Sequence, residues 1–141
     1  MKKLSFLLLA FALVACSSGG SNEVEKTGSV ETAKDEKGNY ATAEVTIKGD
    51  KIVSISLDEY KEGKSKKELG ASYNMKAASS IGKEWNEQIE ALEKYIVKNG
   101  IDKIELTDEG KPKNEDVLTG CTMAIDNVLL AAKGAIEAAK K

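Results

Sequence analysis

Residues 40–60 read YATAEVTIKGDKIVSISLDEY, and this stretch decides the fold. Its first half alternates between polar and apolar residues, the apolar ones being Ala41, Ala43, Val45 and Ile47. A period of two is typical of a strand with one buried face. Gly49 and Asp50 then form a turn signal, and a second run rich in Ile, Val and Leu follows. The stretch therefore predicts an antiparallel β-hairpin.

Two helices are predicted after the hairpin. The first carries an apolar stripe at spacings of four, three and four, formed by Trp85, Ile89, Leu92 and Ile96. Asn99 and Gly100 supply its stop signal, and Trp85 is expected to pack in the core. The second helix is rich in alanine, with its apolar residues at Met123, Ile125, Val128, Leu129, Ala132 and Ile136. Lysines near its end suit the negative pole of a helix.

Shorter elements complete the expected fold. Residues 29–33 are a candidate edge strand, residues 103–106 a candidate short strand, and residues 108–114 a turn containing the single proline. The lysine-rich residues 61–67 are expected to form a solvated loop. A hairpin followed by two amphipathic helices predicts an α+β domain over residues 28–141, with a small antiparallel sheet and two packed helices.

The N-terminus has the pattern of an export signal. Lys2 and Lys3 precede residues 4–14, which are almost continuously apolar but too short to span a bilayer. The following Leu-Val-Ala-Cys, ending at Cys16, resembles the lipobox of bacterial lipoproteins, which implies that Cys16 carries lipid and that residues 1–15 are removed. The alternative is an ordinary signal peptide with a cysteine nearby. Residues 16–27 are predicted to be the lipidated cysteine and a flexible tether. The expected location is the extracellular face of the cell membrane, through a lipid anchor.

Composition excludes several classes of function. The chain has 23 acidic and 21 basic residues, all of the latter lysine, and it has no histidine. This charge balance argues against nucleic-acid binding. Without histidine there is no His-based catalysis or His metal site, and a single cysteine beyond Cys16 excludes a cysteine zinc site. Redox or group-transfer chemistry would therefore need a cofactor.

Residues 116–126, DVLTGCTMAID, hold the candidate site. Thr122 stands just before the apolar period of the last helix and is a plausible N-cap. Gly120 would allow a sharp turn into that helix. A helix cap accounts for Thr122, but it does not account for Asp116, Thr119 and Gly120 as a set.

The stretch resembles the flavinylation motif of the FMN-binding domain family, written D-x-x-S/T-G-A-T. That family includes covalent-flavin subunits of sodium-pumping quinone reductases and small exported lipoproteins of extracellular electron transfer. The resemblance implies that Thr122 carries FMN through a phosphoester bond, installed from FAD by a flavin transferase. Asp116, Thr119 and Gly120 match the rest of the motif, whereas Cys121 replaces the usual alanine. Cys121 is interpreted as a small tolerated side chain.

Residues 69–100 are similar to the lipoprotein branch of the same family, in which a Tyr-x-Met element precedes a helix with an early tryptophan. Tyr73 and Met75 are the matching residues here, and they are candidates to contact the flavin ring, with core or rim positions as the alternative. The resemblance implies a membrane-anchored electron carrier, not a self-contained enzyme. Its partners would be a membrane quinol-oxidising dehydrogenase as donor and an extracellular acceptor, such as ferric iron or a reductase.

Elementary chemistry agrees with an external transferase. A threonine hydroxyl is a poor nucleophile without a base, and this chain has no histidine. A phosphoester at the start of the last helix would also meet free N–H groups and the positive helix pole. Two other functions stay open: a lipoprotein that binds flavin non-covalently, and a structural or adhesive surface lipoprotein in which Thr122 only caps a helix. A signalling fragment from the signal peptide is a further possibility.

Overall fold

The computed structural model describes residues 23–141. The predicted signal peptide, the predicted lipid site at Cys16 and residues 16–22 of the predicted tether lie outside the described residues. Within residues 23–141, no helix is both long and apolar enough to cross a bilayer.

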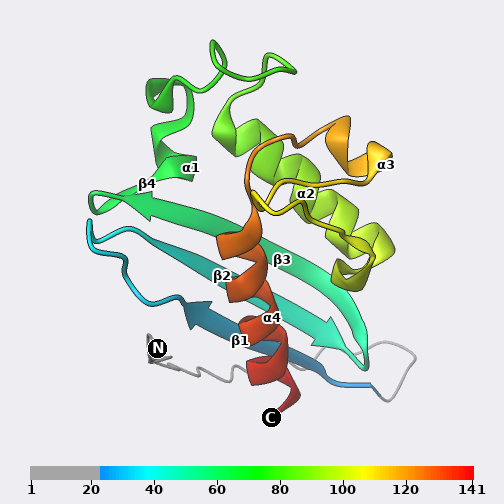
Figure 1. Ribbon diagram of the computed structural model, residues 1–141. Coiled ribbons are helices and arrows are strands. Elements are labelled where there is room, and N and C mark those ends of the chain that lie inside the picture. Colours follow the sequence, from blue (N-terminus) through cyan, green and yellow to red (C-terminus); the bar gives the residue numbers. More distant parts are fainter. Residues whose placement is uncertain (1–22) are drawn as a thin grey trace.

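Four strands form one antiparallel sheet in the order β1-β2-β3-β4 (Figure 1). They are β1 Glu25–Glu31, β2 Tyr40–Lys48, β3 Lys51–Lys61 and β4 Lys64–Ser65. The helices that follow are α1 Lys66–Leu69, η1 Gly70–Tyr73, α2 Trp85–Asn99, η2 Ile101–Lys103, α3 Glu115–Leu118 and α4 Asp126–Lys140. The predicted hairpin and the α+β fold class, with two long helices packed on the sheet, are confirmed.

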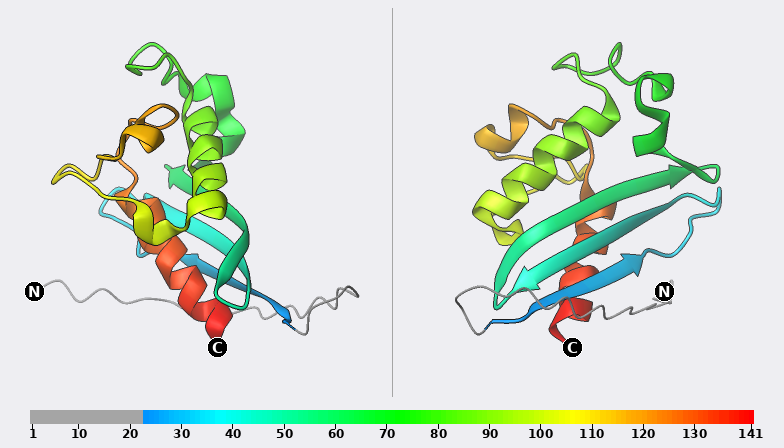
Figure 2. Two further views of the ribbon diagram at one scale, coloured as in Figure 1. Left: turned by 90° about the vertical axis from the view of Figure 1, so that its right-hand side faces the viewer. Right: turned by 180° about the vertical axis from the view of Figure 1, so that it is seen from behind.

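Both long helices cover the same face of the sheet (Figure 2). Helix α4 lies across β1 and β2, while α2 packs along β3. The alternation in β2 is the reason, because its alanines, Val45 and Ile47 are buried and the residues between them are half-buried or exposed. The opposite face of the sheet has no covering layer among the described residues. The molecule is therefore a two-layer sandwich of helices on a sheet.

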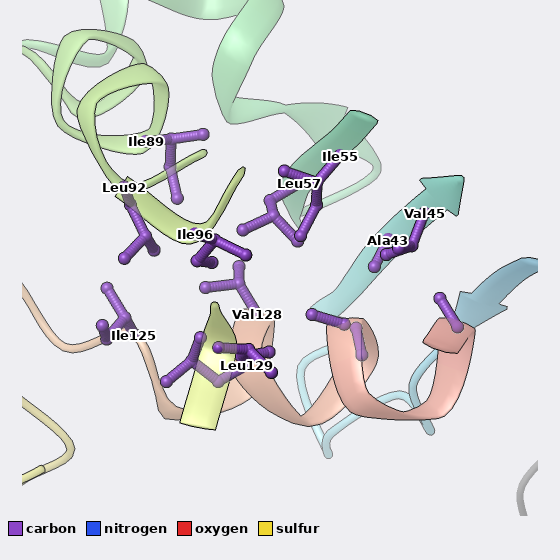
Figure 3. Close-up of a cluster of buried hydrophobic side chains, with 14 of the residues drawn as sticks. Ala43, Val45, Ile55, Leu57, Ile89, Leu92, Ile96, Ile125, Val128 and Leu129 are labelled. Atoms are coloured by element: carbon purple, nitrogen blue, oxygen red, sulfur yellow. The ribbon is translucent and has the colours of Figure 1, made fainter. Parts of the chain in front are cut away.

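The core lies between the two layers (Figure 3). Leu57 of β3, Ile89 of α2 and Val128 of α4 meet there, and none is more than 1 % exposed. The single tryptophan, Trp85, is 2 % exposed, which confirms its predicted place in the core. Burial of large apolar side chains is the main term that holds the layers together, at about 1.5–3 kcal/mol for each.

Strand β1 differs from the predicted edge strand at residues 29–33. It begins at Glu25, so the last three residues of the predicted tether pair with β2, with Glu25 opposite Lys48. Only Val30 contributes a large buried side chain in β1, so the strand has no visible apolar period. Pairing to the neighbouring strand, which sequence periodicity does not report, sets its true limits.

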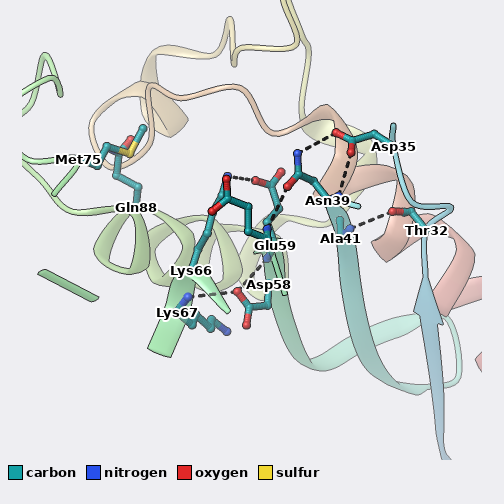
Figure 4. A network of polar contacts seen from close by, with 11 residues as sticks. Thr32, Asp35, Asn39, Ala41, Asp58, Glu59, Lys66, Lys67, Met75 and Gln88 are labelled. Carbon is teal, nitrogen blue, oxygen red and sulfur yellow. Dashed lines mark hydrogen bonds and ion pairs between the residues drawn. The ribbon is translucent and has the colours of Figure 1, made fainter. Parts of the chain in front are cut away.

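Two other expectations were wrong. Residues 61–67 do not form a solvated loop, because β4 and the start of α1 lie there. Lys66 pairs with Glu59 (Figure 4), and Lys67 pairs with Glu93. Glu93 also accepts a hydrogen bond from the Leu57 N–H at 2.7 Å, which ties the edge of β3 to α2. The predicted strand at residues 103–106 is absent from the described chain, where η2 ends at Lys103 and Leu106 makes only an isolated bridge to Pro112.

Candidate functional site

Thr122 lies in the turn that joins α3 to α4. Helix α4 begins at Asp126, and its N-cap position is Ile125, which makes no side-chain cap bond. The predicted helix cap at Thr122 is therefore wrong, and so is the expected support of a phosphate there by the positive pole of α4. Met123 and Ile125 are buried and match the apolar period of the helix, but both residues precede its first residue, Asp126. The Ile125 N–H donates instead to the Gly110 carbonyl at 2.8 Å.

Gly120 is required by close packing and not by turn geometry. A Cβ added at this position would lie 2.7 Å from the Cβ of Ala91, on α2. Gly120 does lie in a turn, as expected, but its backbone does not have a positive φ, so the turn geometry itself does not require glycine. The absence of a side chain lets the turn lie directly on α2.

Cys121 points into the core and is 0 % exposed. Burial raises the pKa of its thiol to about 11, although the Met123 N–H nearby acts in the opposite direction. A thiol with this pKa is protonated at neutral pH and is a poor nucleophile. This agrees with the interpretation of Cys121 as a small side chain, and places the residue beneath the candidate site instead of in contact with an open surface.

Asp116 and Thr119 are exposed and lie on the α2 side of the turn. The Thr119 hydroxyl donates to the Asp116 carbonyl at 2.8 Å and so closes the last turn of α3. Burial raises the pKa of Tyr95, and the charge of Asp116 and its hydrogen bond raise it further. Tyr95, Asp116 and Thr119 line a depression of about 330 Å³, to which Thr122 does not contribute.

Gln88 joins Thr122 to Met75. The Thr122 N–H donates to Oε1 of Gln88 at 3.0 Å. The amide nitrogen of Gln88 donates to the Ser79 hydroxyl and to the Lys83 carbonyl, both at 3.2 Å, and lies 3.8 Å from the Met75 sulfur (Figure 4). Two predicted site residues that are far apart in the sequence thus meet at one buried side chain.

The segment between η1 and α2, residues 74–84, crosses over this junction, and we refer to it as the strap. Its Ser80 hydroxyl donates to Oγ1 of Thr122 at 3.3 Å. Its ends are held together by Glu84, which accepts from the Met75 N–H at 2.9 Å and also forms a capping box with Glu87. Thr122 is half-buried as a residue, and the contact between its hydroxyl and the Ser80 hydroxyl is exposed.

Tyr73 lines a separate pocket of about 310 Å³ beside the strap, together with Tyr40, Tyr60, Lys66 and Asn127 among others. The rings of Tyr40 and Tyr60 stack with centroids 4.7 Å apart. The Lys66 ammonium lies 5.2 Å from the Tyr73 ring and 5.4 Å from the Trp85 ring. Asn127 is the second residue of α4, so the pocket opens at the end of α4 that Thr122 precedes.

Sequence reasoning missed Gln88 and Ser80. A signal for Gln88 was present, because it is a polar residue on the buried stripe of α2, between Trp85 and Ile89. Nothing in the sequence marks Ser80. Among residues 23–141, no group of three or more His, Cys, Asp or Glu side chains could hold a metal ion.

No protein-family model matches the chain, and no curated protein matches it significantly. The fold is similar to a solution NMR structure of a protein from Clostridium thermocellum, determined by a structural genomics consortium. The two chains are 26% identical, and the alignment covers 82% of this chain and 91% of the other, with a TM-score of 0.53. The likeness supports the α+β fold over most of the chain.

Proposed function

We propose that the protein is a membrane-anchored extracellular electron carrier whose FMN is bonded to Thr122 through a phosphoester. The main support for this proposal is a contact that two predicted site residues share. Met75 and Thr122 come from two separate stretches of the family resemblance, and both contact Gln88. This contact brings the two stretches of the resemblance, which are remote in sequence, to one place in the fold.

The pocket beside the strap suits a flavin ring. It is lined by Tyr40, Tyr60 and Tyr73, and aromatic side chains suit the flat, largely apolar isoalloxazine ring. Lys66 and Glu59 also line this pocket as an ion pair, so together they bring no net charge to a ring bound there. Ser80 offers a hydroxyl donor at 3.3 Å from the atom that would carry the phosphate.

The attachment step is a phosphoryl transfer with FAD as the donor. The Thr122 oxygen forms a bond to the phosphorus on the flavin side, and the pyrophosphate P–O bond breaks. AMP leaves with the bridging oxygen, and the hydroxyl proton passes to a base of the flavin transferase, since this chain has no histidine to accept it. Covalent attachment keeps the cofactor on an exported protein that would otherwise lose it by dilution.

Bound FMN supplies reversible uptake of one or two electrons, which this chain's side chains cannot provide alone. With lipid on Cys16, the carrier would stay at the outer face of the cell membrane. It would receive electrons from a membrane quinol-oxidising dehydrogenase and deliver them to an external acceptor.

The deciding experiment is the intact mass of the full-length chain with Cys16→Ser, produced with and without a flavin transferase. Thr122→Ala and Thr122→Ser are produced in the same way. We expect a mass gain of one FMN less one water that needs the transferase, is absent in Thr122→Ala and returns in Thr122→Ser.

The rival functions give different results. Yellow colour without a mass gain, lost on denaturation, would favour a lipoprotein that binds flavin non-covalently. Absence of both colour and mass gain with an active transferase would contradict the carrier proposal and favour a structural or adhesive lipoprotein.

A further inference from the structure

We propose that Gln88 is the positioning residue of the acceptor: its side-chain amide fixes the main chain of Thr122, and thereby the direction of the Thr122 hydroxyl. The proposal rests on the proposed function for its chemistry. Its structural part concerns the hydrogen bond between Gln88 and the Thr122 N–H, and this bond is tested without the flavin.

Gln88 is a polar residue whose side chain is fully buried, which is energetically unfavourable unless its polar groups are hydrogen-bonded. It is 0 % exposed, and Ser65 is the only other polar or charged residue that is buried in the described part of the chain. A buried amide without partners is strongly unfavourable, so its carbonyl and amino groups need bonds. Both are satisfied here, by the Thr122 N–H on one side and by Ser79 and Lys83 on the other. An apolar residue would suit α2 better if packing were the only demand on this position.

Among the described residues, one hydrogen bond joins the main chain of this turn to α2. Gly120 and Cys121 each donate their N–H to the Val117 carbonyl, and Ile125 donates to the Gly110 carbonyl. Between these points, the Thr122 N–H has Gln88 as its acceptor. Loss of the Gln88 carbonyl oxygen would leave the middle of the turn without its bond to α2.

Fixing the main chain of Thr122 also fixes its hydroxyl. Threonine is β-branched, so few χ1 angles are allowed once the backbone is held. The Ser80 hydroxyl contacts the Thr122 hydroxyl at 3.3 Å on the exposed side. Because Ser79 and Lys83 bond to the same amide, Gln88 connects Thr122 to both of these strap residues. A nucleophile displaced by a fraction of an ångström reacts more slowly, which is how a residue that touches no flavin can control attachment.

The test compares Gln88→Met and Gln88→Glu with the parent, all as full-length chain with Cys16→Ser. Methionine keeps the length of the side chain but removes both polar groups. Glutamate keeps an acceptor for the Thr122 N–H and loses the donor to the strap. The control is Ser65→Ala, which removes a buried hydroxyl that bonds to Asp58 and caps α1 and makes no hydrogen bond to Thr122 or Gln88.

Two quantities are measured: hydrogen exchange of the Thr122 amide by NMR, and the rate of flavin attachment by intact mass over time. In Gln88→Met we expect Thr122 exchange to rise about tenfold and attachment to slow about tenfold. In Gln88→Glu the amide should stay protected and attachment should be largely retained. Ser65→Ala should lower the melting temperature without changing either quantity.

Three results would overturn the proposal: unchanged Thr122 exchange in Gln88→Met, normal attachment in that variant, or equal slowing in Ser65→Ala at the same loss of melting temperature. If Gln88→Met does not fold, rapid Thr122 exchange in a folded Gln88→Glu would overturn it. A parent chain that takes up no flavin would contradict only the proposed function. Hydrogen exchange of the Thr122 amide in the parent and in Gln88→Met would still decide whether Gln88 holds Thr122.

Discussion

At the scale of single residues, contacts with the rest of the fold explain two positions of the motif around Thr122. Gly120 is needed because Ala91 leaves no space for a Cβ. Cys121 must be small and apolar because it is fully enclosed in the core. Thr122 differs from both, because its N–H is bonded to the buried Gln88 while the residue itself is half-buried. Packing therefore accounts for two of these three adjacent positions, and it gives no reason for the threonine.

The contact between Gly120 and Ala91 predicts the stability of Gly120→Ala. An added Cβ at 2.7 Å must push the turn away from α2, at a cost of about 1–3 kcal/mol in the free energy of unfolding. Urea denaturation of Gly120→Ala, Ala91→Gly and the double variant measures it. The double variant should be more stable than the sum of the single changes predicts. Additive losses would mean that the two residues do not touch.

Cys121 predicts a pH dependence of stability. Because burial raises its pKa from 9.0 to about 11, the unfolded chain loses this proton first as the pH rises. The stability that the protonated thiol contributes is fully present below pH 9 and is lost as the pH rises to about 11, and the total loss in the free energy of unfolding is roughly 3 kcal/mol. Unfolding of the parent and of Cys121→Ala, measured from pH 7 to 11, should show a steeper fall for the parent. Parallel curves would show that the thiol reaches solvent.

At the scale of elements, the seating of α4 on the sheet depends on a glycine. Gly28 lies where β1 passes beneath α4, and a Cβ there would be 2.1 Å from the Ala135 carbonyl oxygen and 2.4 Å from the Ala139 nitrogen. Both are main-chain atoms, so no side chain can move aside. The close approach of helix and strand explains why β1 belongs to the fold although it has little apolar surface of its own.

Gly28→Ala is therefore expected to lower the free energy of unfolding by 3 kcal/mol or more, on the order of the largest single-site effects, because α4 must shift bodily. Gly134→Ala is the matched control from the opposite side of the contact. Its nearest atoms belong to the Val30 side chain at 3.3 Å, which can adjust, and alanine also favours the helix. Thermal unfolding followed by circular dichroism measures both variants. A Gly28→Ala protein as stable as the parent would contradict this account of the contact.

At the scale of the whole molecule, the pocket that contains Tyr73 and the N-terminal end of the described chain lie at opposite ends of the domain. Glu23 lies beside the turn at Gly49, whereas the pocket with Tyr73 is at the other end of β3 and of α4. The eleven residues of β3 span about 35 Å. With the proposed lipid anchor on the N-terminal side, the flavin would face away from the point of attachment. Under the proposed function, this geometry would place the flavin toward an external acceptor.

A single continuous core predicts that the domain unfolds as one unit. Trp85 reports on α2, and circular dichroism at far-ultraviolet wavelengths reports on all the helices and strands. The two signals should give the same urea midpoint, because both layers share one set of buried contacts. Separate midpoints would show that α2 and its strap unfold independently of the sheet and α4.

The sequence by itself determined the elements with a regular local pattern. The hairpin at residues 40–60 and the stripe of α2 follow from the period of their apolar residues, because a half-buried strand or helix must repeat its apolar face at a fixed interval. The choice of Thr122, Thr119 and Asp116 also came from the sequence, through resemblance. The same periodicity misplaced the start of α4, since buried residues in an irregular turn look like helical ones.

Only the tertiary structure decided which distant residues meet. The role of Gln88 depends on contacts to the strap and to Thr122, both far from it along the chain. The need for glycine at positions 28 and 120 arises from helices that are remote in sequence. The limits of β1 depend on its pairing with β2. Local pattern reflects the surroundings of one element, whereas a site made by several elements is defined by distances that only their packing sets.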